Sequence, residues 1–300
     1  MYTYSFSEEE QKYLSEYDMT KYEHPSVAAD MAIFSIMEEG ESDNFRKLPQ
    51  KALKILLVKR AEYPFKDMWA LPGGFCNSSE DVCETAYRKL FQETNVKNAY
   101  LSLTGVFGEK SRDPRGWIIS NTYLALVDGS VCEVQPGTHV REAGWFSVIV
   151  TSELVKKEIK GDAIDVWTDY ELSLVCEKQN LKIGGKIREY KHFFACHETV
   201  KYEILENEGL AFDHAKIILH TILALRKTVE NDIRIGFDLM PELFTLTQLQ
   251  NAFELVLDEK LLAANFRRKI NNYVIETDQS IEGAGHRPAK LFKRNVEEFY

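Results

Sequence analysis

The sequence predicts a two-domain α+β protein, in which a domain built on strands precedes a smaller, mainly helical domain. Three observations predict this class. The length of 300 residues favours about two domains. Apolar runs of strand length recur between residues 27 and 127. From Leu210 onward the apolar residues follow a helical period, and the chain then carries a basic helix and two short strands.

An N-terminal arm of residues 1–24 is expected to precede the two domains, as a short polar helix or an extended segment. It holds no apolar run of the kind that a signal peptide or a membrane-spanning helix requires. The first domain is then expected over 25–205, with 150–205 as an insert or elaboration, and the second over 206–300. The five cysteines are scattered without CxxC spacing, so we expect reduced thiols in a cytoplasmic protein.

Apolar runs bounded by polar residues predict the strands of the first domain. A strand of this kind buries one or both faces in a sheet, whereas the polar segments between runs form loops. The strands are expected at 27–36, 55–59, 101–107 and 120–127, with a loop at 40–44 between the first two.

The later part of the first domain has a less regular pattern. Residues 143–146 are expected to close the sheet, and residues 151–159 to form a short helix. The pattern then returns to strands over about 167–205, with a hairpin tip at 182–185.

A glycine-containing loop, Trp69 to Gly74, leads from the second strand into a helix. Ser78 or Ser79 is expected to cap the amino end of this helix, because a hydroxyl oxygen can accept a hydrogen bond from its free N–H groups. Glu80 and Asp81 would then lie in the first turn, where the helix dipole favours negative charge.

The stretch from Gly74 to Val96 has the spacing of a phosphate-handling motif. Its layout resembles the Nudix box, G-x5-E-x7-R-E-U-x-E-E-x-G-U, where U is a bulky aliphatic residue. Three positions depart from it, because Lys89, Gln92 and Asn95 stand where the family has Glu, Glu and Gly. The positions that match are Gly74, Glu80, Arg88, Leu90, Glu93 and Val96.

The resemblance implies a site that has lost its metal ligands. In Nudix hydrolases the carboxylates of this helix hold divalent ions that activate water against a pyrophosphate. Two of those carboxylates are missing here, and Glu93 alone is a poor cage for a hard cation that prefers several oxygen ligands. We therefore expect no catalytic residue, with Glu80, Arg88 and Glu93 as vestiges and Glu93 as the remaining candidate metal ligand.

The box also supplies candidate effector-binding residues. Gly73 and Gly74 allow a phosphate to approach the backbone closely, although they can equally serve only the tight turn. Lys89 can contact a pyrophosphate directly and replace part of the metal's charge. Alternatively, Lys89 points to solvent or pairs with Glu93 one helical turn away.

The segment from Arg112 to Gly116 is the second candidate effector site. Asp113 before Pro114 favours a turn, which is expected to project Arg112 and Arg115 from the loop toward phosphate or ribose oxygens. In the alternative, one arginine ties the loop to Glu109 or Asp113.

The second domain has the element order of a winged helix-turn-helix. A first amphipathic helix begins near Leu210, and Thr245 with Gln248 forms a capping box for a second helix over 246–257. A third, basic helix is expected over 263–272. Two strands, 273–277 and 290–293, are joined by a glycine-containing loop. The apolar positions of the first helix are Ile217, Ile218, Ile222, Leu225 and Val229.

Positive charge is concentrated in this part of a chain whose net charge is −10. Between Leu262 and Arg294 there are seven Lys or Arg against three Asp or Glu. Basic side chains provide most of the affinity for a DNA duplex, and helix side chains then contact base edges. The alternative is a solvated basic face. The candidate DNA-binding residues are Asn265, Arg267, Arg268, Lys269, Arg287 and Lys290.

The whole chain resembles the Nudix-related transcriptional regulators of bacteria, in which a Nudix domain precedes a winged helix. The resemblance implies a Nudix-type α/β/α sandwich with a mixed sheet, followed by a C-terminal winged helix-turn-helix domain. The resemblance covers roughly residues 25–147 and 209–294. It implies a DNA-binding homodimer that senses ADP-ribose or a related nucleotide or sugar phosphate, and therefore a link to NAD metabolism. No cofactor is implied. The segments that match are Trp69–Phe75, Phe107–Gly108, Arg112–Gly116, Leu210–Ala215, Asn265–Lys269 and His286–Lys290.

A Nudix hydrolase is the alternative function. Such an enzyme would cleave ADP-ribose or a similar nucleoside diphosphate derivative to AMP and ribose 5-phosphate, and it would require Mg²⁺. Glu80 and Glu93, with Glu109 from outside the box, are the carboxylates available for that ion. Lys89 and Gln92 argue against this alternative, and a protein–protein adaptor would leave the basic helix unexplained.

Overall fold

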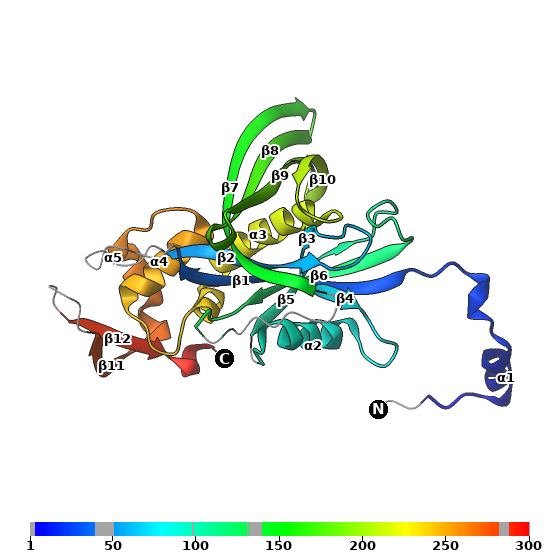
Figure 1. The fold of residues 1–300 in the computed structure, drawn as a ribbon, viewed down its shortest axis with the longest axis horizontal. Coiled ribbons are helices and arrows are strands. Elements are labelled where there is room, and N and C mark those ends of the chain that lie inside the picture. The colour runs from blue at the N-terminus through cyan, green and yellow to red at the C-terminus, as the bar shows by residue number, and fades with distance from the viewer. Residues whose placement is uncertain are drawn as a thin grey trace.

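The computed structural model describes residues 4–39, 51–97, 99–130, 132, 140–281 and 288–299. Figure 1 shows a long central sheet with helix α2 on one face and helix α3 on the other. Helices α4 and α5 and the small hairpin lie together at one end of the molecule, and the arm with α1 stands away from the other end. Within the described ranges, no helix is long and apolar enough to cross a membrane.

The first domain is built on a mixed sheet, as the sequence predicts. Strand β1 pairs antiparallel with β2 and parallel with β6. The strand order is β10-β9-β8-β7-β2-β1-β6-β5, and the short strands β3 and β4 pair with β2 and β1. The strands expected at 27–36, 55–59, 101–107 and 120–127 are confirmed as β1 (Ser26–Glu38), β2 (Lys51–Arg60), β5 (Tyr100–Phe107) and β6 (Ile118–Leu126), with somewhat different bounds. The stretch from Trp69 to Gly74, expected as a loop, instead carries two short strands that pair with β2 and β1, namely β3 (Trp69–Ala70) and β4 (Gly73–Phe75). The loop expected at 40–44 lies outside the described residues.

Four long strands extend this sheet. The helix expected at 151–159 is wrong, because these residues continue β7 and pair with β8 from Thr151 opposite Glu171 to Ile159 opposite Ile164. The helix propensity of the Glu, Leu and Lys residues there is outweighed by pairing with β8, which is interrupted by one irregularity between Leu154 and Lys156. Residues 143–146 do not close the sheet either, since three strands follow β7. The extension comprises β7 (Val140–Lys160), β8 (Ala163–Cys176), β9 (Leu181–Phe194) and β10 (His197–Glu208).

The hairpin tip expected at 182–185 is also wrong. The turn between β8 and β9 is the short 3-10 helix Glu177–Gln179, and Gly184 and Gly185 lie inside β9. A Cβ added at Gly184 would collide with the backbone oxygen of Leu172 on the neighbouring strand. The glycine therefore serves a close approach of two backbones and not a turn.

Helix α2 (Val82–Thr94) carries the Nudix-like motif. Its cap is Asp81 and not Ser78 or Ser79: the Glu84 amide donates to the Asp81 carboxylate at 2.8 Å, and the Glu84 carboxylate accepts from the Asp81 amide at 2.9 Å. A reciprocal box of this kind satisfies two free N–H groups, which a lone serine hydroxyl does not.

The C-terminal part has the expected winged-helix order. The capping box of Thr245 with Gln248 is confirmed, and the apolar positions expected of the first helix are all buried. The arm carries α1 (Glu8–Glu16), in which no residue is buried. The remaining elements are α3 (His214–Asn231), α4 (Leu246–Leu257), α5 (Ala263–Ile270), β11 (Val274–Ile281) and β12 (Ala289–Arg294).

One continuous hydrophobic core joins the two parts. It runs from sheet residues such as Phe34 and Phe146, through Ile218 and Leu225 of α3, to Phe253 of α4. An ion pair also joins α3 to the end of α4, because Nη2 of Arg226 lies 3.1 Å from Oδ2 of Asp258. Helix α3 therefore packs both on the sheet and on the C-terminal winged-helix part.

Candidate functional site

A cavity of about 150 Å³ lies beside the glycine-containing loop. Gly73 and Gly74 of β4 form one wall, Glu93 of α2 another, and Arg112 and Arg115 of the loop before β6 a third. Gly73 is required at its position, because an added Cβ would collide with the carboxylate of Asp30 and the backbone oxygen of Ala29. The structure thus brings four of the five candidate effector residues to one cavity.

Lys89, the fifth candidate, lies against that wall. A Cβ added at Gly74 would be 2.7 Å from Cε and 3.2 Å from Nζ of Lys89, so the lysine side chain covers this glycine. No carboxylate among the described residues lies within ion-pair distance of its ammonium, and the expected alternative pair with Glu93 is therefore not formed. The lysine charge is nevertheless close enough to lower the pKa of Glu93.

Glu93 is an unusual carboxylate. It is 5% exposed, and its Oε2 atom has no hydrogen-bond partner in the described part of the chain. Burial raises its pKa, with the charge of Lys89 acting in the opposite direction. A buried carboxylate oxygen without a partner costs free energy, so this atom points to a group that is supplied from outside the chain.

Glu80 and Arg88 form a pair of a different kind. Oε1 of Glu80 lies 2.5 Å from Nη2 of Arg88, and Oε2 lies 2.9 Å from Nε. The guanidinium of Arg88 lowers the pKa of Glu80 to about 2. The pair ties the loop before α2 to the helix, and it occupies both carboxylate oxygens of Glu80 with the guanidinium of Arg88.

The described residues do not fit the magnesium ion that the Nudix box implies. No group of three His, Cys, Asp or Glu side chains converges within those residues. Glu80 is held by Arg88, Gln92 is exposed, and a lysine covers Gly74. Glu93 offers one buried carboxylate oxygen that has no partner among the described residues.

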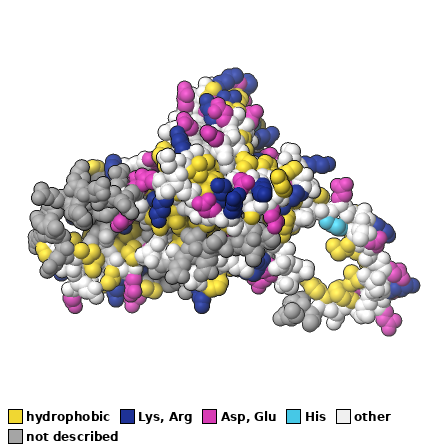
Figure 2. Space-filling view, in the orientation of Figure 1, with side chains coloured by type: hydrophobic (Ala, Val, Ile, Leu, Met, Phe, Trp, Pro, Cys, Tyr) yellow, Lys and Arg dark blue, Asp and Glu magenta, His cyan; other side chains and the backbone are white. Residues whose placement is uncertain are grey.

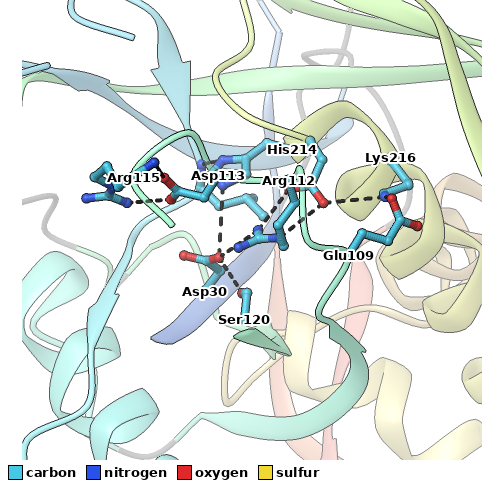
Figure 3. A network of polar contacts seen from close by, with 10 residues as sticks. Asp30, Glu109, Arg112, Asp113, Arg115, Ser120, His214 and Lys216 are labelled. Atoms are coloured by element: carbon cyan, nitrogen blue, oxygen red, sulfur yellow. Dashed lines mark hydrogen bonds and ion pairs between the residues drawn. The ribbon is translucent and has the colours of Figure 1, made fainter. Parts of the chain in front are cut away.

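Arg112 is buried and does not project from its loop as the sequence analysis expected. Its Nη2 lies 2.8 Å from Oδ1 of Asp213 and 3.8 Å from Oδ2 of Asp30, and its side chain is 3% exposed. Figure 3 shows this guanidinium above the carboxylate of Asp30. Local turn chemistry could not predict the burial, because Asp213 lies 101 residues further along the chain. Arg112 still lines the cavity, and it also anchors the amino end of α3.

Arg115 is half-exposed and is paired with Asp113. This is the alternative expected from the sequence, in which one arginine ties the loop to Glu109 or Asp113. Its Nε and Nη2 atoms lie 3.0 and 2.7 Å from the two carboxylate oxygens of Asp113. Its guanidinium also lies over the rings of Phe75 and Phe212, at 5.2 and 5.4 Å.

Sequence reasoning missed several residues of this site. His214 is fully buried, and its Nδ1 accepts a hydrogen bond from the Leu71 amide at 2.9 Å. Asp30 accepts a short hydrogen bond from Ser120. Arg60 lines the cavity as well. A signal for Asp30 was present, since it is a lone charge inside an otherwise apolar strand.

A second, more open cavity of about 510 Å³ shares Arg112 and Phe212 with the first. Tyr202 and Ile204 of β10 form part of its lining, as does Lys216, whose Nζ lies 3.0 Å from Oε2 of Glu109. The strands beyond residue 150 therefore contribute to the surroundings of the site.

The candidate DNA interface is the exposed face of α5. Phe266 and Ile270 are buried and fix the helix, and the Phe266 ring lies 5.3 Å from that of Phe253. Lys290, on β12, is paired with Glu276 at 2.8 Å. Arg287 lies outside the described residues. The four exposed candidates on α5 are Asn265, Arg267, Arg268 and Lys269.

Two family models match this chain. Residues 48–166 match the model of the NUDIX domain, and residues 236–293 match that of the NrtR DNA-binding winged helix domain. The chain is 30% identical over 294 residues to the ADPR responsive transcriptional repressor NtrR of Acinetobacter baylyi, covering 97% of this chain and 90% of the relative. It is 37% identical over 140 residues to the ADP-ribose pyrophosphatase of Methanocaldococcus jannaschii, covering 46% of this chain and 72% of that protein.

Solved structures share the fold. A MutT/nudix family protein from Enterococcus faecalis matches with a TM-score of 0.60 and 23% identity, over 98% of this chain and 100% of that one. Shewanella oneidensis NrtR complexed with a 27mer DNA matches with a TM-score of 0.56 and 23% identity, over 90% of this chain and 94% of that one. The similarity to these structures extends over both domains.

Proposed function

This chain belongs to the Nudix-related transcriptional regulators, and on that premise we propose that it binds operator DNA and senses ADP-ribose or a related nucleotide or sugar phosphate. Its Nudix domain would bind the effector without cleaving it, and its winged helix would bind DNA as part of a homodimer in the cytoplasm. A relative with this domain order is named an ADPR responsive repressor, which supports the proposal.

The observation that carries the proposal is the position of Lys89 against Gly74. A sensor must bind its ligand and leave it intact. The family's metal-associated glutamate is replaced by a cation that itself attracts phosphate, while the glycine-lined cavity is retained. The cavity therefore keeps the features that bind an anion and lacks the ligand set that activates water.

The DNA-binding half supports the same function. Helix α5 is held by two buried apolar residues and presents Asn265, Arg267 and Arg268 to solvent. Arg and Asn side chains match guanine and adenine edges in a major groove, and adjacent basic groups contact phosphates.

A Nudix hydrolase remains the second candidate, favoured by the 37% identity to an ADP-ribose pyrophosphatase. It would require Mg²⁺, for which Glu93 offers a carboxylate oxygen without a partner among the described residues.

A phosphorus NMR titration of ADP-ribose with the full chain and excess magnesium distinguishes the two candidates. We expect pyrophosphate signals that shift or broaden and persist, followed by a change in the affinity for operator DNA. Signals of AMP and ribose 5-phosphate would favour the hydrolase.

A further inference from the structure

The wall of the cavity opposite α2 carries an arrangement of arginines that no motif predicts. Arg60, at the end of β2, and Arg115 both line the cavity and both lie against the ring of Phe212. The Arg60 guanidinium is 4.9 Å and the Arg115 guanidinium 5.4 Å from the centre of that ring. Two like charges are thus held on one aromatic residue at the edge of one cavity.

These two cations are incompletely neutralised. Arg60 donates through Nε to the backbone oxygen of Pro64 at 2.8 Å, and it forms no ion pair with a described carboxylate. Arg115 uses Nε and Nη2 for Asp113. Both terminal nitrogens of Arg60 and the Nη1 atom of Arg115 therefore remain for a ligand, as far as the described residues show.

The electrostatics agree with this geometry. Burial lowers the pKa of Arg60 and the neighbouring charge of Arg115 lowers it further, while the charges of Asp113, Glu62 and Asp30 act in the opposite direction and offset only part of this effect. A half-buried guanidinium beside a like charge is unfavourable unless an anion compensates it. Across the same cavity, Oε2 of Glu93 is buried and has no described partner, so it requires a hydrogen-bond donor.

We propose that Arg60 and Arg115 form an anion clamp that receives a phosphate group of the effector directly, with no metal ion between them. Glu93 accepts a hydrogen bond from a hydroxyl group of the same ligand. The cavity is thereby specific for a phosphate ester that carries a nearby hydroxyl, as sugar phosphates and nucleoside diphosphate sugars do. This inference rests on the proposed function and assigns Arg60 as a binding residue.

The chemistry of the clamp explains why arginine is used. A guanidinium presents parallel N–H groups that match two phosphate oxygens, whereas an ammonium is a point charge. Arg60→Gln removes the charge and Arg60→Lys retains it without the fork. The matched control is Arg141→Gln, because Arg141 is a 63% exposed side chain on neighbouring strand β7 that pairs with Asp67 and does not line the cavity.

The test is isothermal titration calorimetry of the full chain with ADP-ribose and with inorganic pyrophosphate, each in EDTA and in magnesium. We expect ADP-ribose to bind equally well in both buffers. Arg60→Gln should weaken both ligands at least about tenfold, Arg60→Lys should weaken them less, and Arg141→Gln should leave them unchanged. Glu93→Ala, which removes the acceptor, should weaken ADP-ribose more than pyrophosphate, which has no sugar hydroxyl.

Binding that appears only with magnesium, or an Arg60→Gln variant that binds as tightly as the parent, would overturn the clamp. If the parent chain binds pyrophosphate in EDTA through Arg60 but does not bind ADP-ribose, the clamp stands and ADP-ribose is excluded as the effector. If it binds neither ligand, both inferences fail. A thermal melt of each variant separates loss of binding from loss of fold.

Discussion

Lys89 is the single residue that most separates this site from a metal-dependent one. Its ammonium lies over a glycine of the cavity wall, where it adds positive charge without a metal ion. Glu93 stands one helical turn away with a free oxygen, so the two side chains give this helix both a donor and an acceptor for a ligand. We therefore expect a site of this composition to bind an anion whether or not a divalent cation is present.

Reversal of the charge at Lys89 should weaken the effector complex. In EDTA, Lys89→Glu is expected to raise the Kd of ADP-ribose at least about tenfold, because it places a carboxylate beside the phosphate and beside Glu93. Lys97→Glu is the control, since Lys97 is an exposed lysine just beyond the same helix. Equal affinities for the parent and Lys89→Glu, measured by calorimetry, would show that this lysine does not contact the ligand.

His214 should make the stability of the protein depend on pH. Burial lowers its pKa below the usual value of 6.5, and its Nδ1 accepts a hydrogen bond that requires the neutral ring. The unfolded chain then binds the proton more readily than the folded chain, so stability is retained above pH 6.5 and is lost as the pH falls toward the lowered pKa. The charged groups that act on the ring are Asp30, Asp213, Arg112 and Arg60.

Urea unfolding between about pH 5 and pH 8 checks this prediction, because this range spans the usual histidine pKa of about 6.5. The free energy of unfolding should fall on the acid side in the parent, and the fall should be smaller in His214→Gln, which keeps an acceptor for the Leu71 amide. The same pH profile in both proteins would assign the effect to other groups.

At the scale of elements, α5 is a short helix whose position depends on two buried side chains and whose exposed face is basic. Each arginine that contacts a phosphate releases counterions, which makes binding dependent on salt. The wing strand β12 contributes less free charge, because Lys290 is paired with Glu276. The affinity for DNA should therefore depend mainly on α5.

Replacement of Arg268 by Ala should weaken binding to any duplex and reduce the slope of log K against log salt by about 1. Fluorescence anisotropy with a labelled duplex at several salt concentrations measures both quantities. Lys178→Ala, in the turn between β8 and β9, is a control with the same change of charge far from α5. An unchanged salt slope in Arg268→Ala would place the phosphate contacts elsewhere.

Features that depend on residues close together in the sequence could be predicted. Features that depend on a partner from another element could not. The capping box of Thr245 with Gln248 is local, and the structure has it. Residues 151–159 form a strand only because β8 pairs with them, and their composition favours a helix. At the site, Gly73 and Gly74 were predictable from a motif. The burial of Arg112 was not, because its carboxylate partner comes from another element.

The whole molecule shares one core. Buried residues of the sheet, of α3 and of α4 belong to a single apolar cluster, and the amino end of α3 reaches the effector cavity. The space-filling view in Figure 2 shows a surface of mixed charge over this core, with the arm standing apart. A substitution that destabilises the DNA-binding part should therefore also lower the stability of the sheet.

The four tryptophans, Trp69, Trp117, Trp145 and Trp167, all precede the winged helix, so their fluorescence reports the first domain. Leu249→Ala, in the buried face of α4, should lower the thermal midpoint of that fluorescence, with a destabilisation of about 2–5 kcal/mol. Leu262→Ala is the control, because Leu262 is 74% exposed. A tryptophan midpoint that does not move in Leu249→Ala would mean that the two parts unfold independently.

The shared core also limits how far this protein behaves as a set of interchangeable modules. If the chain is cut between the sheet and α4, each fragment exposes a hydrophobic surface that is buried in the intact protein. Such fragments should aggregate. A winged helix grafted from a distant relative would lack the side chains that interlock with Ile218 and Leu225. Engineering of a new operator preference is therefore better confined to the exposed side of α5 than attempted by exchange of the whole domain.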